Sequence, residues 1–354
     1  FRSSEGVPAE VAEWVFRTAP AGGGPPVWDD ARRDAALAAV RDALERRYSH
    51  RDRMPEGLSE HLGSDPALAA ARTGFEFGAA LAAALAPIAD PHLTVQGDGE
   101  SFATTRRRIA PDWNLGEVKK QLDSPNQRSR QVFDGRVGNE VLYLAIGTFD
   151  ATSDADLVDA ALQAIDEAED VPALILDVRM NGGGSELLAR SIAGAFTAEP
   201  VTYAKHRTID PATEDGFGPF RTRILEPSRD AEHLPYRGKM PYPGKVFVLT
   251  GPTTMSSAEA FVMMMRACGA TLVGLPTAGH SGNPLPTSID DDVVLMLPSW
   301  RAYDAERDAL EGAGIAPDVR VEADPKRLRT GDPAFERALE LALSPSAERS
   351  SSDR

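Results

Sequence analysis

Residues 246–261 read VFVLTGPTTMSSAEAF, and this stretch decides the fold that we expect. The four apolar residues at its start predict a short buried strand, and residues from Ala258 to Cys268 favour a helix. Between them the chain bends sharply, with Ser256 and Ser257 at the entrance to the helix. A serine there lies beside unpaired backbone N–H groups, so it is either a helix cap or a nucleophile whose oxyanion those groups stabilise.

The composition excludes several classes of protein. With 354 residues and 42% apolar content, the chain has material for one large or two modest domains. Its formal net charge of −16 argues against nucleic acid or an anionic membrane surface as partner. No run reaches the roughly 18 apolar residues of a membrane span, which argues against membrane insertion. The chain begins at Phe1 rather than methionine, so we expect a processed or trimmed form whose compartment cannot be read from composition.

The single cysteine, Cys268, excludes an intramolecular disulfide and any metal site built from cysteines. It ends a methionine-rich apolar run, so we interpret it as a core residue rather than a nucleophile. No group of histidines or carboxylates has the spacing of metal ligands, so we expect no metal and no organic cofactor.

The first quarter of the chain predicts a small helical module, residues 1–95. We expect a short helix at 9–17, a helix at 29–48 because its apolar residues fall on one face, and an alanine-rich helix at 67–86, which Pro87 should end. His92 follows in a turn before an expected strand at 93–95, where a histidine is either a structural residue or a catalytic one. Residues 96–138 are polar without clear periodicity, and we expect them to form a connection.

From Asn139 the pattern alternates between strand and helix, which predicts a layered α/β core at 139–343. Expected strands lie at 141–146, 171–177, 246–249, 271–274 and 293–298. Expected helices lie at 154–169, capped by Ser153, at 186–196 and at 258–268. The long polar segment 197–243 is expected to form a hairpin or a flap over a site, and the polar tail 344–354 to be disordered.

A second stretch that could take part in binding or catalysis is the glycine run from Asn181 to Gly184, which follows a strand and opens a helix. Glycines there let the backbone approach a ligand and direct N–H groups at negative charge. The run lacks the Gly-Lys-Ser/Thr ending of a phosphate loop and the spaced glycines of a dinucleotide site. A tight turn without a ligand remains open. We favour an oxyanion hole, with one N–H from Gly182 or Gly183 and another from Ser257.

Four motifs together resemble the tail-specific, or C-terminal-processing, serine peptidases. They are LILDVRMNGGGS at 174–185, TMSSAEAF at 254–261, GLPTAGHSG at 274–282 and EGAGIAPDV at 311–319. The second resembles the nucleophile motif of that family, in which the serine lies three residues before a glutamate. The resemblance, from about Asp90 to Val321, implies a crotonase/ClpP-like α/β core with Ser256 as nucleophile.

One departure selects the branch of the family. The loop 274–282 contains no lysine, so the Ser–Lys branch does not fit; His280 lies on or near the place of that lysine. The sequence is more similar to the branch typified by the tricorn core protease and including interphotoreceptor retinoid-binding protein. That branch uses a histidine far upstream and a glutamate near the closing motif, which implies His92 as general base and Glu311 as its helper. His280 remains an alternative base.

The resemblance implies a serine-type peptidase that hydrolyses unfolded or short peptides through an acyl-enzyme on Ser256. It also favours an exported location, periplasmic or extracellular. Two other functions stay open: a non-catalytic module that binds a peptide or an apolar ligand on the same fold, and an esterase of small acyl substrates. Cleavage preference and oligomeric state cannot be read from the sequence.

Overall fold

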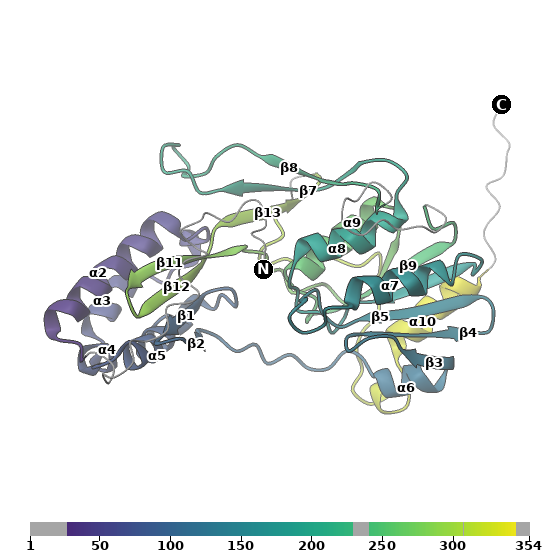
Figure 1. Ribbon diagram of the computed structural model, residues 1–354, viewed down its shortest axis with the longest axis horizontal. Helices are drawn as coiled ribbons and strands as arrows, with labels where there is room; N and C mark the ends of the chain where they lie inside the picture. Colours follow the sequence, from purple (N-terminus) through teal and green to yellow (C-terminus); the bar gives the residue numbers. More distant parts are fainter. Residues whose placement is uncertain (1–26, 229–240, 307, 345–354) are drawn as a thin grey trace. The chain divides into compact units, whose positions relative to one another are not determined.

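A computed structural model describes residues 27–228, 241–306 and 308–344 of the chain (Figure 1). The expected helix at 9–17 and nearly all of the expected tail at 344–354 lie outside the described residues. The described residues form two compact units. The first comprises residues 27–107, 208–218 and 282–300, and the second comprises the rest.

The second unit is built on a seven-stranded mixed sheet. Its strand order is β14-β10-β9-β6-β5-β4-β3, and the contiguous pairs from β5 to β14 are parallel. The strands are β3 (Asp123–Gln127), β4 (Val132–Val137), β5 (Val141–Ile146), β6 (Ala173–Asp177), β9 (Lys245–Thr250), β10 (Thr271–Gly274) and β14 (Val319–Arg320). The strands expected at 141–146, 171–177, 246–249 and 271–274 are confirmed, and so is the layered α/β class.

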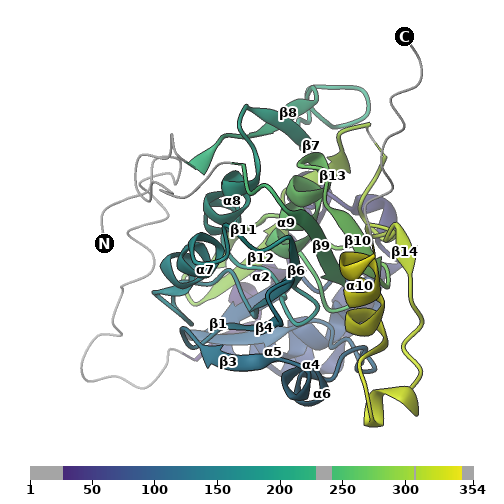
Figure 2. The same ribbon diagram turned by 90° about the vertical axis from the view of Figure 1, so that its right-hand side faces the viewer.

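Alternate residues of these strands pack on opposite faces of the sheet. Leu174 and Leu176 belong to the core shared with α7 (Leu157–Asp166), α8 (Glu186–Ala193) and α9 (Ser257–Ala267). Ala173 and Ile175 belong to the core under α6 (Leu115–Lys120) and α10 (Pro333–Leu343), and Figure 2 shows α10 in yellow on the opposite side of the sheet from α7 and α8. Strands buried on both faces need apolar side chains on both, which explains the four apolar residues ALIL that precede Asp177 in β6.

Cys268 follows α9 and packs against the first of these cores. Burial raises the pKa of its thiol to about 12, so the thiolate is disfavoured. Its position agrees with the interpretation of this cysteine as a core residue.

The polar segment 197–243 contains a hairpin, β7 (Val201–Thr208) and β8 (Arg221–Leu225), which confirms that part of the prediction. Strand β13 (Trp300–Asp304) joins them in a three-stranded sheet of order β13-β7-β8. The Arg223 guanidinium donates to Glu186 Oε1 over 2.6 Å, which fastens β8 to the first turn of α8. A role of the hairpin as a flap stays a prediction.

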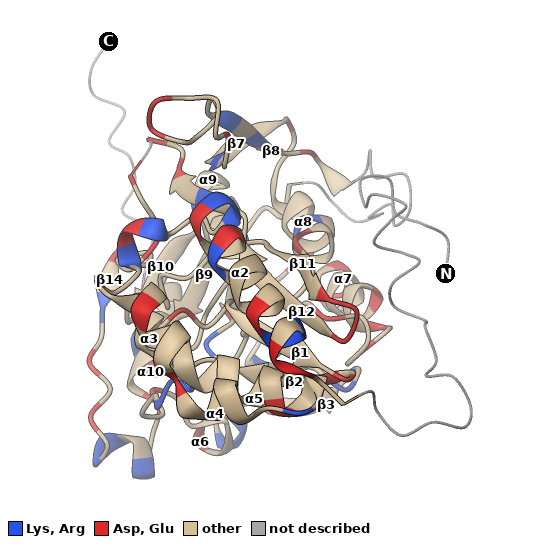
Figure 3. Cartoon of the chain, turned by 90° about the vertical axis from the view of Figure 1, so that its left-hand side faces the viewer, with Lys and Arg blue, Asp and Glu red and all other residues tan. Residues whose placement is uncertain are grey.

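The first unit is a four-stranded antiparallel sheet with helices against it. The sheet has the order β11-β12-β1-β2, with β11 (Pro284–Asp290), β12 (Val293–Pro298), β1 (Thr94–Gly97) and β2 (Glu100–Ala103). The helices are α2 (Asp30–Arg47), α3 (Leu58–Ser64), α4 (Pro66–Ala70) and α5 (Gly74–Ala84). Val40 and Leu44 of α2 are buried, and Figure 3 shows the positions of both charge signs along this helix, of which Arg33 is also buried. The helix expected at 29–48 is confirmed.

Three expectations about local structure are corrected. The single helix expected at 67–86 is two, α4 and α5, because Ala71 is extended and the Thr73 side chain caps a new helix by accepting the Glu76 N–H. The expected connection at 96–138 contains β2, α6, β3 and β4. Ser153 does not cap α7: its hydroxyl donates to Asp150 Oδ2, and the helix begins after Asp156.

The strand expected at 293–298 forms as β12, yet it belongs to the first unit instead of the α/β core. It pairs with β1 in the register Val95↔Leu295, and both residues lie in the core beneath α2 and α5. A strand joins the sheet that covers its apolar face, and alternation along one strand does not reveal which sheet that is.

Candidate active site

Ser256 occupies a strained bend between β9 and α9. It is the N-cap residue of α9, with φ 58° and ψ −123°. An ordinary N-cap is extended, and a non-glycine residue at positive φ costs roughly 1–3 kcal/mol. A serine on a sharp, strained strand-to-helix turn is the arrangement of a nucleophile elbow. The Ser256 backbone therefore differs from that of an ordinary helix cap, although Ser256 and Glu259 also form a capping box.

The glycine run lies directly against this bend. Gly183 has φ 108°, and a side-chain carbon added to it would lie 2.8 Å from Ser256 Cβ and 2.9 Å from the Met255 oxygen. Only glycine fits between the two segments. Its own N–H donates to Asn181 Oδ1 over 2.8 Å. Across the described residues, the N–H groups of Gly182 and Ser257 have no hydrogen-bond acceptor.

Hydrogen bonds tie the glycine loop to the carboxyl ends of three parallel strands. The Asn181 side-chain amide donates to the Ile146 oxygen at the end of β5, and the Asn181 carbonyl accepts the Met255 N–H over 3.2 Å. The Thr254 hydroxyl donates to the Val178 oxygen over 3.0 Å, just beyond β6. Parallel α/β sheets place their functional loops at this edge, so the local geometry is that of a site.

His280 and Glu311 meet beside the same bend. The Ser256 N–H donates to the His280 carbonyl over 3.0 Å, and His280 Nδ1 lies 3.0 Å from Glu311 Oε1. The second oxygen of Glu311 accepts the Ser281 N–H over 3.0 Å. Both side chains of the pair are 12% exposed. The second unit therefore brings together three predicted site residues: Ser256, His280 and Glu311.

His92 lies in the first unit, in a turn between α5 and β1, as its sequence context predicted. The turn is built on Asp90, which is 1% exposed. One oxygen of its carboxylate accepts the His92 N–H over 2.9 Å, and the other accepts the Tyr48 hydroxyl over 2.8 Å. Buried Asp90 therefore determines the backbone from which the half-buried His92 projects.

The sequence interpretation assigned no role to Glu259, although it belongs to the nucleophile motif. Its side chain is fully buried, one turn after Ser256, and accepts hydrogen bonds from the Ser256 N–H and from the loop that carries His280. A glutamate three residues after an N-cap serine is the spacing of a capping box, and this signal could have predicted the first of these contacts.

The sequence model of peptidase family S41 matches residues 140–321, just over half of the chain. The chain belongs to peptidase family S41. It is a serine-type peptidase, and its substrates are peptides or proteins.

Solved structures show the same fold at low sequence identity. A candidate peptidase of Parabacteroides merdae superposes with a TM-score of 0.69 at 19% identity, covering 88% of this chain and 97% of that one. Mature CPAF gives a TM-score of 0.60 at 12% identity, with 88% and 97% covered. A lipoprotein from Streptococcus agalactiae gives 0.56 at 14% identity, with 92% and 99% covered.

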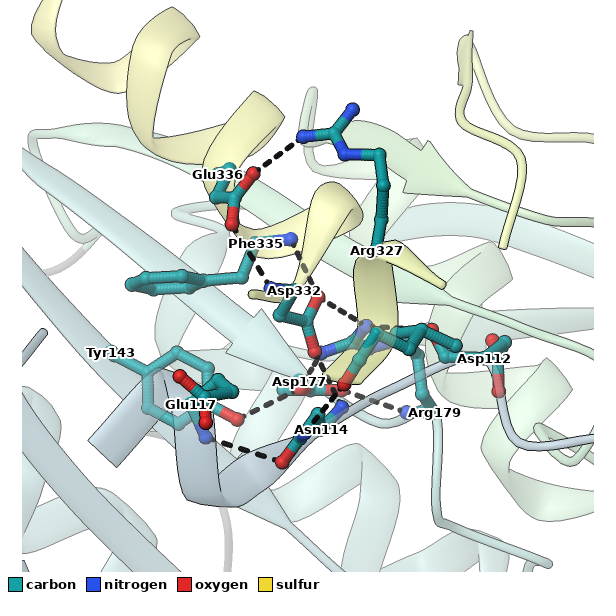
Figure 4. A network of polar contacts seen from close by, with 11 residues as sticks. Asp112, Asn114, Glu117, Tyr143, Asp177, Arg179, Arg327, Asp332, Phe335 and Glu336 are labelled. Carbon is teal, nitrogen blue, oxygen red and sulfur yellow. Dashed lines mark hydrogen bonds and ion pairs between the residues drawn. The ribbon is translucent and has the colours of Figure 1, made fainter. Parts of the chain in front are cut away.

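A buried ionic network of this S41 peptidase is centred on Arg179, two residues before the glycine loop (Figure 4). Arg179, two residues after β6, pairs with Asp177 over 2.6 Å and with Asp332 over 2.8 Å, and all three side chains are at most 1% exposed. Tyr143 donates its hydroxyl to Asp177, and Asp332 caps α10 by accepting the Phe335 N–H. Burial alone lowers the pKa of Arg179, but the two aspartates outweigh it and raise that pKa above its ordinary value.

Asp112 joins the same region of the S41 peptidase. Its main-chain oxygen accepts a hydrogen bond from Arg179, and its carboxylate lies against Gly251 at the end of β9. Burial raises the pKa of Asp112 to about 6, and the charge of Arg179 opposes this rise. A buried carboxyl with a raised pKa therefore packs beside the chain that leads to the nucleophile bend.

Within either unit taken alone, no three His, Cys, Asp or Glu side chains of the described residues offer ligand atoms to one metal ion. The expectation that the peptidase uses no metal or organic cofactor stays a prediction. Among the described helices, none combines the length and apolar character that a bilayer crossing requires.

Proposed function

We propose that Ser256 is the nucleophile of this serine peptidase and that the N–H groups of Gly182 and Ser257 form its oxyanion hole. The observation that carries the proposal is the strained Ser256 bend, packed so closely on Gly183 that no side chain fits between them. Gly183 then serves by its missing side chain, because its N–H is already bonded to Asn181. Each oxyanion donor of this kind lowers the barrier by about 3 kcal/mol.

The reaction is acyl transfer to Ser256 and then to water. As Ser256 Oγ attacks the peptide carbonyl carbon, a histidine accepts its proton and then gives that proton to the leaving amine. Water hydrolyses the resulting ester with the same histidine as base. Substrates would be unfolded or short peptides bound in extended form beside the glycine loop, since the nucleophile attacks a backbone carbonyl.

For the base we propose His92, with Glu311 stabilising the imidazolium. The family resemblance supports this assignment, and so does the turn that Asp90 builds around the His92 backbone. His280 is the second candidate, because its Nδ1 already pairs with Glu311 Oε1 and its carbonyl accepts the Ser256 N–H. A neutral histidine held through Nδ1 by a carboxylate has its other nitrogen suited to accept a proton.

Labelling with a fluorophosphonate tests the nucleophile. We expect the wild-type chain to be labelled, Ser256→Ala to lose all labelling, and Ser257→Ala to retain it, because the oxyanion donor of Ser257 is its backbone N–H. Labelling of Ser256→Ala at the wild-type rate would overturn the proposal. Absence of labelling in the wild type, with peptides bound but uncleaved, would favour the binding module, and cleavage of esters alone would favour the esterase.

The two histidines are separated by their single variants in the same assay. We expect His92→Ala to slow labelling by 10²–10⁴-fold, the usual contribution of a general base, and His280→Ala to slow it by about 10-fold. The reverse order would transfer the base role to His280.

A further inference from the structure

Four hydrogen-bond donors converge on the carboxylate of Glu259, which is 0% exposed. Oε2 accepts the Ser256 N–H over 3.0 Å and the His280 N–H over 3.1 Å. Oε1 accepts the Thr277 hydroxyl over 2.6 Å and the Gly279 N–H over 2.7 Å. One side chain therefore joins the nucleophile bend to the loop that follows β10.

All four partners act as donors at this site. Three are backbone N–H groups, and the fourth is the Thr277 hydroxyl, whose oxygen also accepts the Ile315 N–H over 2.7 Å. Only an ionised carboxylate accepts from four donors at once. A proton on Oε2 would meet a backbone N–H, and a proton on Oε1 would require the Thr277 hydroxyl to stop donating to Glu259, so at least one of the four bonds would be lost.

We propose that ionised Glu259 is a positioning residue, holding the strained Ser256 bend and the His280 loop in their reactive arrangement, and that its protonation lowers the activity as the pH falls. The proposal rests on the proposed function of Ser256. Glu259 acts through its neighbours: it sets the direction of the Ser256 backbone, and through His280 it sets the place of the pair with Glu311.

No Lys or Arg side chain of the described residues forms an ion pair with Glu259. The loop after β10 contributes one titratable group, His280, whose ring bonds to Glu311 of the following segment. On α9 itself the other charged side chain is Arg266, at the opposite end of the helix and within 3.6 Å of Asp318. Burial is therefore the dominant influence and raises the pKa of Glu259 to about 7, against the four hydrogen bonds that lower it.

The first test uses Thr277, because its variants change one of the four donors. We expect Thr277→Val to remove a hydrogen bond that lowers the pKa of Glu259, and so to move the acidic limb of the fluorophosphonate labelling rate upward by about one pH unit. Thr277→Ser keeps the hydroxyl and should leave the limb where it is. Identical limbs in the wild type and in both variants would overturn the proposal.

The second test uses Glu259→Gln, whose side chain cannot ionise. We expect labelling at pH 8 to fall by 10- to 100-fold with little change in KM for a peptide, and the acidic limb of the labelling rate to become less steep because Glu259 no longer contributes to it. A wild-type rate with a wild-type acidic limb in Glu259→Gln would contradict the proposal. The Thr277 pair decides the matter if this variant does not fold.

Ser256→Ala, measured alongside, separates this inference from the function on which it rests. If Ser256→Ala is still labelled, the assignment of Ser256 as the nucleophile is wrong. If Ser256→Ala is not labelled but the Thr277 and Glu259 variants keep the wild-type pH profile, only the positioning role of Glu259 is wrong.

Discussion

The pair Asp177 and Asp332 and the single residue Glu259 are all buried acidic side chains, and their surroundings stabilise them in different ways. Asp177 and Asp332 share the cation Arg179, which gives each carboxylate a charged partner. Glu259 has four neutral donors and no cation among the described residues. The first group therefore has a buried charge partner, whereas burial without such a partner raises the pKa of Glu259 to about 7.

The largest effect we expect is on stability, from removing the cation of the first group. Arg179→Met leaves Asp177 and Asp332 buried without compensation, which should cost about 3–5 kcal/mol of unfolding free energy in urea at pH 8. The matched control is Arg327→Met, since Arg327 is 63% exposed and pairs with Glu336 at the surface. Its cost should be below about 1 kcal/mol. Equal losses of unfolding free energy in the two variants would show that the buried Arg179 network stabilises the fold no more than the surface pair of Arg327 and Glu336 does.

The next effect is the pH dependence of stability that Glu259 contributes. Its folded pKa of about 7 lies above the ordinary value of 4.5, so folding favours the neutral form. This carboxyl therefore lowers the unfolding free energy progressively as the pH rises from about 4.5 to about 7, by about 3 kcal/mol in total. Urea titrations of the wild type and Glu259→Gln should differ by that slope. Parallel curves would show that Glu259 does not titrate in this window.

Activity should move in the opposite direction from stability over this window. Ionisation of Glu259 weakens the fold and completes the arrangement around Ser256, so the peptidase gives up stability for a competent site.

The smallest effect we expect is the difference in unfolding free energy between losing a hydrogen bond to a charged acceptor in the Arg179 network and losing one to a neutral acceptor. Tyr143→Phe removes the donor to the charged Asp177 Oδ2 and should cost about 1.5 kcal/mol. Tyr242→Phe removes a donor to the neutral Val171 oxygen and should cost about 1 kcal/mol or less. Both variants should keep the wild-type labelling rate. A loss of labelling in Tyr143→Phe alone would show that the Arg179 network contributes to the reaction.

Much of the site could be predicted from local sequence. The apolar run before Ser256 and the helix after it predicted the bend, because a short buried strand and a methionine-rich helix have distinct patterns. Glycines after the strand that ends at Asp177 predicted a loop that offers an N–H group beside that of Ser257, and Gly183 packs on Ser256. The family match over 140–321 confirms the peptidase class that these motifs indicated.

Other features had no local signal. Alanines at 67–86 suit a continuous helix, yet tertiary contacts of Trp28, whose N–H donates to the Arg72 oxygen, accompany an extended break at Ala71. Polar residues at 96–138 show no periodicity, yet β4 forms because β5 offers it an edge. The assignment of β12 to the first unit depended on which apolar face was left to cover.

By itself, the sequence determined the α/β class, the strand–bend–helix at Ser256 and the glycine loop, because these depend on residues within a few positions of one another. Only the tertiary structure decided that Glu259 would collect four donors and that Arg179 would join Asp177 to Asp332, 155 positions further along the chain at the start of α10. Buried polar groups need hydrogen-bond partners, and in the folded chain these partners come from residues far apart in the sequence, so local spacing does not predict them.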